Sequence, residues 1–268
     1  MGEQVRGRLL IIGGAEDKTG SCLILRRFLE LAGGEQTAVA ILTTATEKPR
    51  EVATEYRRLF LQLGAGEVIH LNVNQRAEAG SRQTMAILAG VNGVFFTGGD
   101  QLRLTSILGG TALEGELNAA VKRGAVLAGT SAGAAAMTDI MIVSGQEESA
   151  PKRSSVRLAP GLGFLKEVVV DQHFAERGRI GRLLAVVAQN PYILGLGLDE
   201  DTALECAPDG FFTVIGSGAC TVVNGLTIDH SNVSDSGLLE PLALTGVTLH
   251  VLPAGYSFDL KTREPGYP

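Results

Sequence analysis

The sequence predicts an α/β fold of three layers, with helices on both faces of a mostly parallel sheet and a small C-terminal β extension. Short, unbroken apolar runs recur along the chain, as in strands that are buried on both faces. Segments with apolar residues at helical spacing separate these runs, which is the pattern of parallel strands with crossover helices. The chain has 268 residues, 45% of them hydrophobic, which is enough for the core of one large domain.

The first elements alternate between strand and helix. Residues 8–14 (RLLIIGG) form an apolar run that ends at a glycine turn, which predicts a buried strand. Residues 22–34 carry apolar residues at helical spacing and stop at a glycine pair, which predicts a helix. The run at 38–44 (AVAILTT) predicts the second strand, 50–63 the next helix and 67–73 (EVIHLNV) the third strand.

The middle of the chain continues the alternation. Residues 91–100 (VNGVFFTGGD) predict the fourth strand, 113–123 (LEGELNAAVKR) a helix and 124–130 (GAVLAGT) the fifth strand. Residues 144–163 form the longest irregular stretch of the sequence. Because long loops in compact domains are often functional, this stretch is expected to be either an active-site loop or a long surface connection.

The last part of the chain changes character. Residues 166–174 (KEVVVDQHF) predict the sixth strand, 179–189 a helix and 192–200 (YILGLGLDE) the seventh strand. Beyond about residue 205 the pattern becomes short β runs, which indicate an antiparallel extension or a small subdomain. Since no linker interrupts the sequence, a single domain over 1–268 is predicted, with its core at about 8–205 and the β extension at about 206–268.

The composition excludes several classes of protein. A formal net charge of −6 without basic runs argues against nucleic-acid binding. The N-terminus shows no export signal and no apolar segment could span a bilayer, so a cytoplasmic protein without membrane contact is expected. The three cysteines, Cys22, Cys206 and Cys220, are scattered, so we expect them to pack as small apolar residues. No metal or cofactor is predicted.

The stretch LAGTSAGAAA at 127–136 suggests a nucleophile. Ser131 stands where an apolar strand passes into a helix, with Gly129 and Gly133 on either side in a G-x-S-x-G pattern. A nucleophile at the tip of a tight turn takes strained dihedrals and tolerates only small neighbours. The alternative interpretation is a serine that caps a helix packed closely on the sheet.

A serine nucleophile needs a base and an acid that orients it. His173 is the one of four histidines that follows a strand at the rim where ligands bind in α/β sheets. The predicted acid is Glu200, at the end of the seventh strand. Its neighbours Asp199 and Asp201 stay alternatives because the strand register is open, and Glu147 and Glu148 are outside candidates on the irregular stretch.

The remaining site residues follow from the needs of the reaction. A developing oxyanion needs N–H donors, which Ala132 and the turn Gly98-Gly99-Asp100, in particular Gly99, could supply. Arginines at a rim bind carboxylates in pairs of hydrogen bonds. The predicted substrate-binding residues therefore combine cations and hydrogen-bond acceptors: Gln101, Asp171, Gln172, Arg177, Arg179 and Arg182.

Five motifs together resemble one family, in order and spacing, over residues 8 to 225. They are GGAEDK (13–18), FTGGDQLRL (96–104), LAGTSAGAA (127–135), VVDQHFAERGRIGRLL (169–184) and GLGLDEDTA (195–203). The chain resembles the cyanophycinases, serine-type exopeptidases related to dipeptidase E and, in fold, to class I glutamine amidotransferases.

This resemblance implies a substrate and a product. It implies hydrolysis of cyanophycin, which has a poly-aspartate backbone with arginine on each β-carboxyl, and release of β-Asp-Arg dipeptides through an acyl-enzyme. It further implies Ser131, His173 and Glu200 as the triad, no metal, and a cytoplasmic homodimer. Three other functions remain: an isoaspartyl or α-aspartyl dipeptidase, a protein that binds aspartate-rich peptides without cleavage, and a glutamine amidotransferase, which the serine in place of cysteine disfavours.

Overall fold

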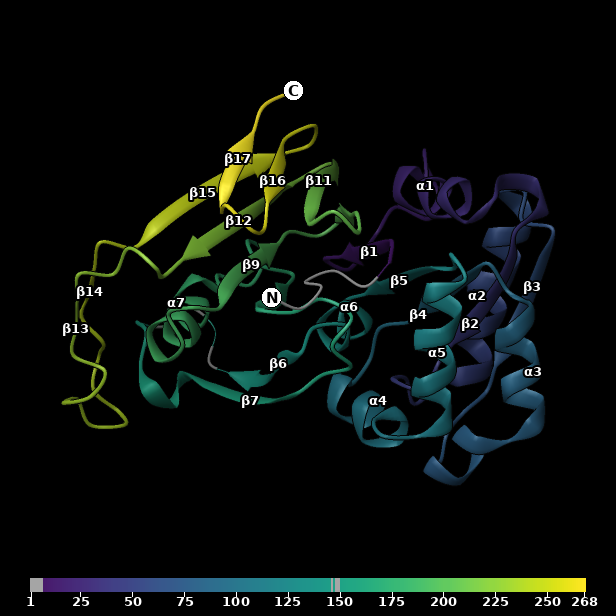
Figure 1. Cartoon of the computed structure of the whole chain (residues 1–268), viewed down its shortest axis with the longest axis horizontal. Helices are drawn as coiled ribbons and strands as arrows, with labels where there is room; N and C mark the ends of the chain where they lie inside the picture. The colour runs from purple at the N-terminus through teal and green to yellow at the C-terminus, as the bar shows by residue number, and fades with distance from the viewer. Residues whose placement is uncertain (1–6, 146, 148–149) are drawn as a thin grey trace.

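The computed structural model describes residues 7–145, 147 and 150–268, and within them the chain forms two main sheets with helices packed on them (Figure 1). The larger sheet has nine strands in the order β17-β16-β11-β10-β1-β5-β4-β2-β3. Its parallel part consists of β1 (Leu9–Ile12), β5 (Val126–Thr130), β4 (Gly93–Phe96), β2 (Ala38–Leu42) and β3 (Glu67–Leu71). Its antiparallel part consists of β10 (Thr202–Cys206), β11 (Phe211–Gly216), β16 (Ser257–Asp259) and β17 (Glu264–Gly266).

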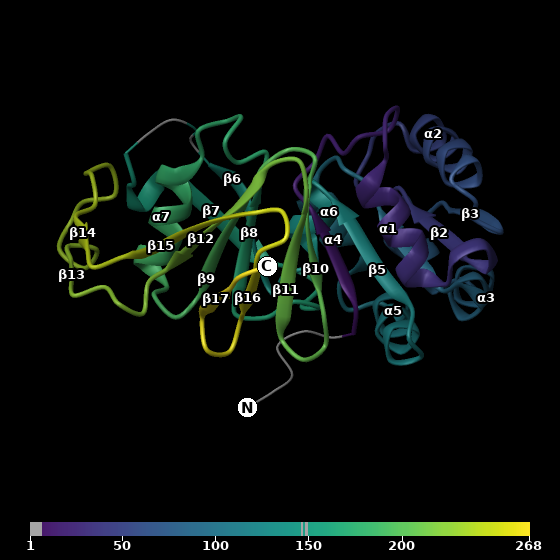
Figure 2. The same ribbon diagram turned by 90° about the horizontal axis from the view of Figure 1, so that it is seen from above.

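A second sheet has four strands in the order β15-β12-β9-β8. These are β15 (Thr248–Pro253), β12 (Ala219–Asn224), β9 (Leu194–Leu198) and β8 (Val168–Gln172). Only β8 and β9 are parallel to each other. The sequence pattern predicts that these two strands lie in one sheet with the first five, which is wrong. They separate because β10, which follows β9 directly, pairs antiparallel with β1 and occupies that edge (Figure 2).

Seven α-helices lie in the described part of the chain. They are α1 (Leu23–Ala32), α2 (Pro49–Gln62), α3 (Arg82–Gly90), α4 (Gln101–Leu108), α5 (Ala112–Lys122), α6 (Ala132–Ala136) and α7 (Ile180–Gln189). The short 3₁₀ helices are Gly34–Gln36, Arg76–Gly80 and Arg153–Ser155. The helices α3 and α4 were not recognised from the sequence.

The alternation of side chains in β1 shows why this is a layered fold. Leu10 and Ile12 pack with Phe28 of α1 and Phe60 of α2 on one face. Leu9 and Ile11 pack on the other face, in a cluster that also contains residues of α3 to α6 and of the four-stranded sheet. All four residues of β1 are fully buried. The predicted α/β class, with a large sheet and helices on both of its faces, is confirmed.

The irregular stretch contains more regular structure than the sequence suggested. Its ends pair as the hairpin β6 (Ile140–Gly145) and β7 (Val156–Pro160). A second small hairpin, β13 (His230–Ser231) with β14 (Leu244–Thr245), lies in the C-terminal part. The strands beyond residue 205 otherwise extend both sheets antiparallel.

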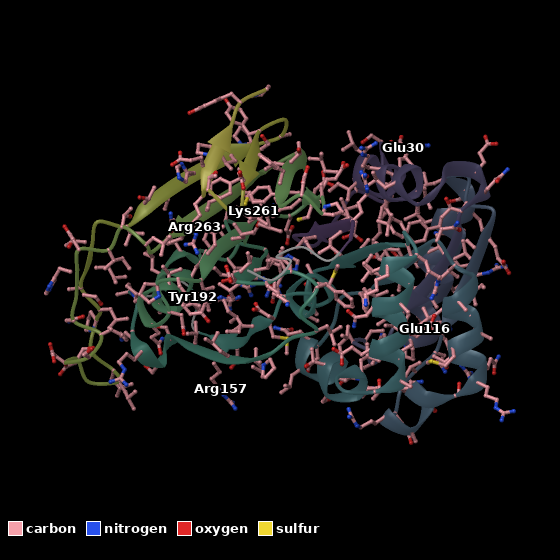
Figure 3. All side chains as sticks on the ribbon, in the orientation of Figure 1. Glu30, Glu116, Arg157, Tyr192, Lys261 and Arg263 are labelled. Atoms are coloured by element: carbon pink, nitrogen blue, oxygen red, sulfur yellow. The ribbon has the colours of Figure 1, made fainter. Side chains whose placement is uncertain are left out.

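One arginine near the C-terminus connects the two sheets. Arg263, in the turn between β16 and β17, donates to Asn224 Oδ1 at the end of β12 at 2.8 Å and to the carbonyl of Tyr192, just before β9. Arg263 and Tyr192 are labelled in Figure 3. This contact fixes the edge of the larger sheet to the four-stranded sheet.

The cysteines and the hydropathy of the helices bear on two expectations from the composition. In the described residues the three cysteines are free and buried, as small apolar residues are. No helix among the same residues has the length and hydropathy needed to cross a membrane.

Candidate active site

Ser131 lies at a sharp turn between β5 and α6. Its φ of 52° and ψ of −111° are strained for a residue with a side chain, and its N–H donates to the carbonyl of Ile12 at 3.0 Å. A Cβ on Gly129 would lie 2.6 Å from the carbonyl carbon of Gly133, and one on Gly133 would lie 2.8 Å from Cβ of Phe96. The two glycines are therefore needed because the turn, the helix and β4 approach closely.

His173 directly follows β8 and faces the serine. Its Nε2 lies 3.0 Å from Ser131 Oγ. Its backbone is left-handed, with a φ of 48°, and its N–H donates to the carbonyl of Gly13 at 2.9 Å. This backbone contact and the turn hold the imidazole toward Ser131.

Glu200 completes the hydrogen-bonded line. Its Oε1 lies 2.6 Å from His173 Nδ1. Asp199 instead accepts from the N–H groups of Ala175 and Ala219, each at 3.1 Å. Asp201 accepts from the N–H of Asp17 at 2.8 Å and from the Ser217 hydroxyl at 2.8 Å. Of the three acids in this turn, Glu200 alone contacts the histidine, and the other two stabilise the loops around it.

Ser131 therefore comes from the nine-stranded sheet, whereas His173 and Glu200 follow strands of the four-stranded sheet. The turn after β1 connects them. The carbonyl of Gly13 accepts from His173, and the carbonyl of Gly14 accepts from the N–H of Asp201 at 2.9 Å. The polar residues at the strand ends thus meet at a junction between two sheets rather than along the rim of one sheet.

Ala132 and Gly99 are the residues whose N–H groups the sequence predicts as oxyanion donors. Ala132 is the first residue of α6, and Gly99 lines the same cavity as Ser131. No hydrogen bond from either N–H occurs among the described residues. The N–H of Asp100, by contrast, donates to the carbonyl of Ala45 at 2.8 Å. Gly99 has a φ of 142°, and a Cβ there would collide with the Ala45 carbonyl, so glycine is required.

A cavity of about 330 Å³ opens beside Ser131 and His173, and we call it the arginine cavity. Its polar side chains include those of Gln101, Glu147, Gln172, Arg177, Arg179 and Arg182. The hairpin strand β6 forms one wall, to which Gln101 is fixed by a 2.7 Å hydrogen bond from Nε2 to the carbonyl of Ile142. Arg177 precedes α7, so it reaches the cavity although it does not share the helical face of Arg182.

Asp171 has a different place from the one expected. It is fully buried and does not line the cavity, so it has no surface that a substrate could reach. It accepts a pair of hydrogen bonds from Arg182, one of them at 2.6 Å from Nε, and one at 3.4 Å from Arg179. Asp171 therefore positions Arg179 and Arg182 from the buried side, away from the cavity.

Glu147, which the sequence suggests only as an alternative triad acid, lines the arginine cavity. Its Oε1 accepts from Arg179 Nη2 at 2.6 Å and lies 3.7 Å from Arg177 Nη1. The hydrogen bond from Arg179 lowers the pKa of the Glu147 carboxyl, which therefore stays ionised at neutral pH. A carboxylate thus already sits on the arginines, which supports their suitability for an anionic group. Glu148 lies outside the described residues.

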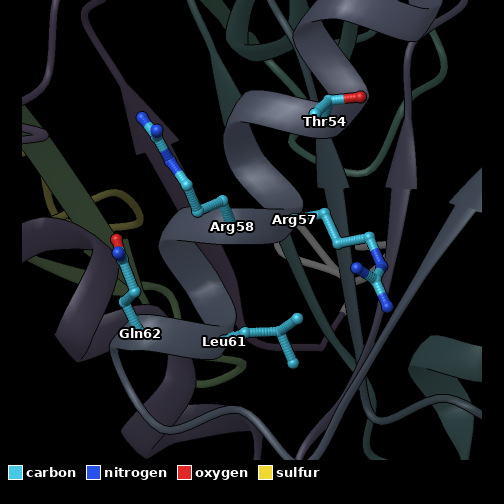
Figure 4. Close-up of a pocket in the computed structure, with 5 residues that line it drawn as sticks. All are labelled: Thr54, Arg57, Arg58, Leu61 and Gln62. Carbon is cyan, nitrogen blue, oxygen red and sulfur yellow. The ribbon is translucent and has the colours of Figure 1, made fainter.

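Two other observations concern metal ligands and a second pocket. The described residues contain no group of three or more His, Cys, Asp or Glu side chains arranged to hold a metal ion. The pocket in Figure 4 is formed by Thr54, Arg57, Arg58, Leu61 and Gln62. All five lie on α2 and none lines the arginine cavity, so this is an outer surface of one helix.

Comparisons with known proteins give the family of the chain. Residues 9–214 match the model of peptidase family S51. The chain is 42% identical over 256 residues to a cyanophycinase of Trichormus variabilis, covering 95% of this chain and 86% of that protein. It is 39% identical over 266 residues to a cyanophycinase of Geminocystis herdmanii, covering 99% and 98% of the two chains.

A solved structure gives the fold independently. The crystal structure of a peptidase from an acI-B1 Actinobacterium superposes with a TM-score of 0.69, at 20% identity, over 96% of this chain and 98% of that one. At this identity the likeness shows a shared fold. Together with the family match, it leads to one conclusion: the chain belongs to peptidase family S51 and is a serine peptidase.

Proposed function

We propose that this peptidase hydrolyses the poly-aspartate backbone of cyanophycin and releases β-Asp-Arg dipeptides. The observation that carries the proposal is the line from Ser131 Oγ through His173 to Glu200, at 3.0 and 2.6 Å, on the floor of a cavity with three arginines. The two cyanophycinases that are about 40% identical over most of the chain support the same substrate.

In the proposed reaction Ser131 is the nucleophile. Its Oγ attacks the carbonyl carbon of a backbone aspartate while His173 Nε2 takes the hydroxyl proton. Glu200 accepts a hydrogen bond from Nδ1–H and so holds the tautomer that leaves Nε2 free as a base. The N–H groups of Gly99 and Ala132 donate to the oxyanion of the tetrahedral intermediate.

Two further steps complete the turnover. The protonated His173 gives its proton to the leaving amine, the C–N bond breaks and an ester to Ser131 remains. Water, deprotonated by the same histidine, then attacks this ester and restores the serine. The acyl-enzyme forms and breaks on the same two side chains, so no metal is needed in this mechanism.

The charges of the arginine cavity fit the side arm of the polymer. Each arm ends in an arginine that carries an α-carboxylate and a guanidinium. Arg177 and Arg179 can bind the carboxylate in place of Glu147, because they already hold a carboxylate there. Glu147 and the amide oxygens of Gln101 and Gln172 offer acceptors for the guanidinium. The resemblance of the motifs also implies exopeptidase cleavage, a homodimer and a cytoplasmic location, which stay predictions.

The experiment is an incubation of purified protein with insoluble cyanophycin, followed by mass spectrometry of the soluble products. The wild type should release β-Asp-Arg and Ser131→Ala should release none. Ser106→Ala, at an exposed serine of α4, is the matched control and should behave as the wild type. Cleavage of short α-aspartyl or β-aspartyl dipeptides without any release from the polymer would instead identify a dipeptidase with the same triad.

A further inference from the structure

Ser131 lines a second cavity, of about 210 Å³, that is separate from the arginine cavity. We call it the Lys18 cavity, and Glu16, Lys18, Glu55, Tyr56, Gly98 and Thr130 are among its lining residues. Among the described residues that line the two cavities, Ser131 is the only one in both. The serine hydroxyl therefore stands at the border between two hollows of the surface.

The floor of the Lys18 cavity is a buried polar network. Glu16 is only 4% exposed, and its carboxylate accepts from the hydroxyl of Tyr56 and, at 2.5 Å, from that of Thr130. Burial and the Glu16 carboxylate raise the pKa of the Tyr56 phenol, which therefore keeps the proton that it donates. Because Thr130 directly precedes Ser131, this network ties the floor of the cavity to the nucleophile.

The mouth of the cavity carries one cation and one anion. Lys18 Nζ lies 3.0 Å from Glu55 Oε1 and 4.4 Å from the centre of the Tyr56 ring. Both side chains are partly exposed, Lys18 at 31% and Glu55 at 47%. Exposed ion pairs are weak, so a ligand that offers each partner a new counter-charge can open this pair at little cost.

The proposed substrate has such a ligand on each side of the bond that is cleaved. Successive repeat units each carry an arm with one carboxylate and one guanidinium. When the scissile carbonyl lies at Ser131 Oγ and one arm fills the arginine cavity, the arm of the neighbouring unit extends past the serine. The cavity beyond Ser131 has one ammonium, one carboxylate and an aromatic face.

We propose, resting on the proposed function, that the Lys18 cavity is the subsite for the repeat unit across the scissile bond. Lys18 binds the arginine α-carboxylate of that unit, and Glu55 binds its guanidinium beside the Tyr56 ring. Glu16 positions the Tyr56 ring and Thr130 and does not contact the substrate. The protein then binds two neighbouring arms of the polymer, one on each side of the nucleophile.

The test uses three synthetic substrates of two repeat units each. One carries both arginine arms, and in each of the other two asparagine replaces one of the two arm-bearing residues. The enzymes are the wild type, Lys18→Gln and Glu55→Gln. The matched control is Glu51→Gln. Glu51 lies on α2, as Glu55 does, and its exposed carboxylate pairs with Lys48 at 3.6 Å outside both cavities.

For the substrate with both arms, KM should rise about tenfold in Lys18→Gln and in Glu55→Gln, as expected for loss of one charge-assisted hydrogen bond, with kcat little changed. For the wild type, KM should rise by a similar factor when either arm of the substrate is removed. In Lys18→Gln and Glu55→Gln, removal of the arm that occupies the Lys18 cavity should no longer raise KM. Removal of the arm that occupies the arginine cavity should raise KM by the same factor as in the wild type. Glu51→Gln should match the wild type throughout.

Two results would overturn the inference in different ways. If both variants discriminate against each missing arm as strongly as the wild type does, the Lys18 cavity is not a subsite, while the proposed function stands. If the wild type cleaves none of the three substrates and releases nothing from the polymer, the proposed function fails and the subsite fails with it.

Discussion

The imidazole of His173 packs directly on the backbone of Gly14. A Cβ at position 14 would lie 2.6 Å from Nε2, the atom that faces Ser131. Gly14 also has a φ of 105°, which disfavours any side chain. The position of the imidazole thus depends on the absence of a side chain at position 14, in the turn after β1.

Gly14→Ala should therefore reduce kcat by about 100-fold or more, since small displacements of a catalytic group have effects of this order. Gly64→Ala is the matched control, because Gly64 has a φ of 98° but nothing within 4 Å of the added Cβ. Each variant should lose about 1 kcal/mol of stability from backbone strain. Steady-state kinetics and thermal unfolding of both variants separate the two effects; equal kcat values would contradict this role of Gly14.

Glu200→Gln should lower kcat by about 10²- to 10⁴-fold while KM changes little, because a carboxamide holds the imidazole less well in the tautomer that the reaction needs. Asp199→Asn is the comparison within the same turn. It should lower the melting temperature, since Asp199 accepts from two backbone N–H groups, and retain far more activity. The reverse order of the two activities would assign the orienting acid to Asp199.

Asp171→Asn should destabilise the fold by about 3–5 kcal/mol, because it removes the counter-charge of the buried Arg182 guanidinium and one of the two carboxylates that contact Arg179. Glu116→Gln breaks an ion pair with Arg123 on the surface and should cost less than about 1 kcal/mol. Denaturant unfolding compares the two variants. If Asp171→Asn lowers the free energy of unfolding by less than about 1 kcal/mol, the buried ion pair stabilises the fold no more than a surface pair does.

The turn that contains Asp17 and Lys18 should stabilise the fold less at low pH. Hydrogen bonds from the backbone N–H groups of Gly20, Cys22 and Thr19 lower the pKa of Asp17 from 3.8 to about 2. Because the pKa in the folded state is the lower one, the stabilising effect of Asp17 is present above pH 3.8 and is lost as the pH falls toward 2. The difference in melting temperature between wild type and Asp17→Asn should therefore shrink over this range, and a constant difference would argue against it.

Serine-directed reagents should inactivate the enzyme, whereas EDTA should not. A sulfonyl fluoride should add to the peptide that contains Ser131, as mass spectrometry can detect, and the adduct should be missing in Ser131→Ala. The activity after dialysis against EDTA should equal that of the untreated enzyme, because the proposed mechanism uses no metal. A loss of activity that added zinc or magnesium restores would contradict the mechanism.

The motifs at strand ends were readable from the sequence because they obey local rules. The strain at Ser131 requires small neighbours, and the sequence shows them as Gly129 and Gly133. The sequence predicted Glu200 as the acid but left Asp199 and Asp201 as alternatives, because the choice depends on which carboxylates the surrounding backbone N–H groups occupy. Contacts of this kind join segments that are far apart in the chain.

The division into two sheets was hidden for a related reason. Runs of apolar residues look the same whichever sheet they join, and only the pairing of β10 with β1 decides where β8 and β9 lie. The role of Asp171 was hidden as well, because its spacing from Arg179 and Arg182 predicts proximity but not which of them faces the cavity. The pairing of Lys18 with Glu55 likewise joins an N-terminal turn to the middle of α2.

The origin of Ser131 in one sheet, and of His173 and Glu200 in the other, has a consequence during synthesis. The strands that carry Ser131 are translated first, whereas β9, Glu200 and β10 follow later in the chain. A ribosome-bound chain that ends before residue 200 holds the Ser131 hydroxyl without Glu200, the third member of the proposed triad. If the proposed triad carries the reaction, hydrolysis requires the later strands to have docked, and we expect unfinished chains to be inert toward the peptide bonds around them.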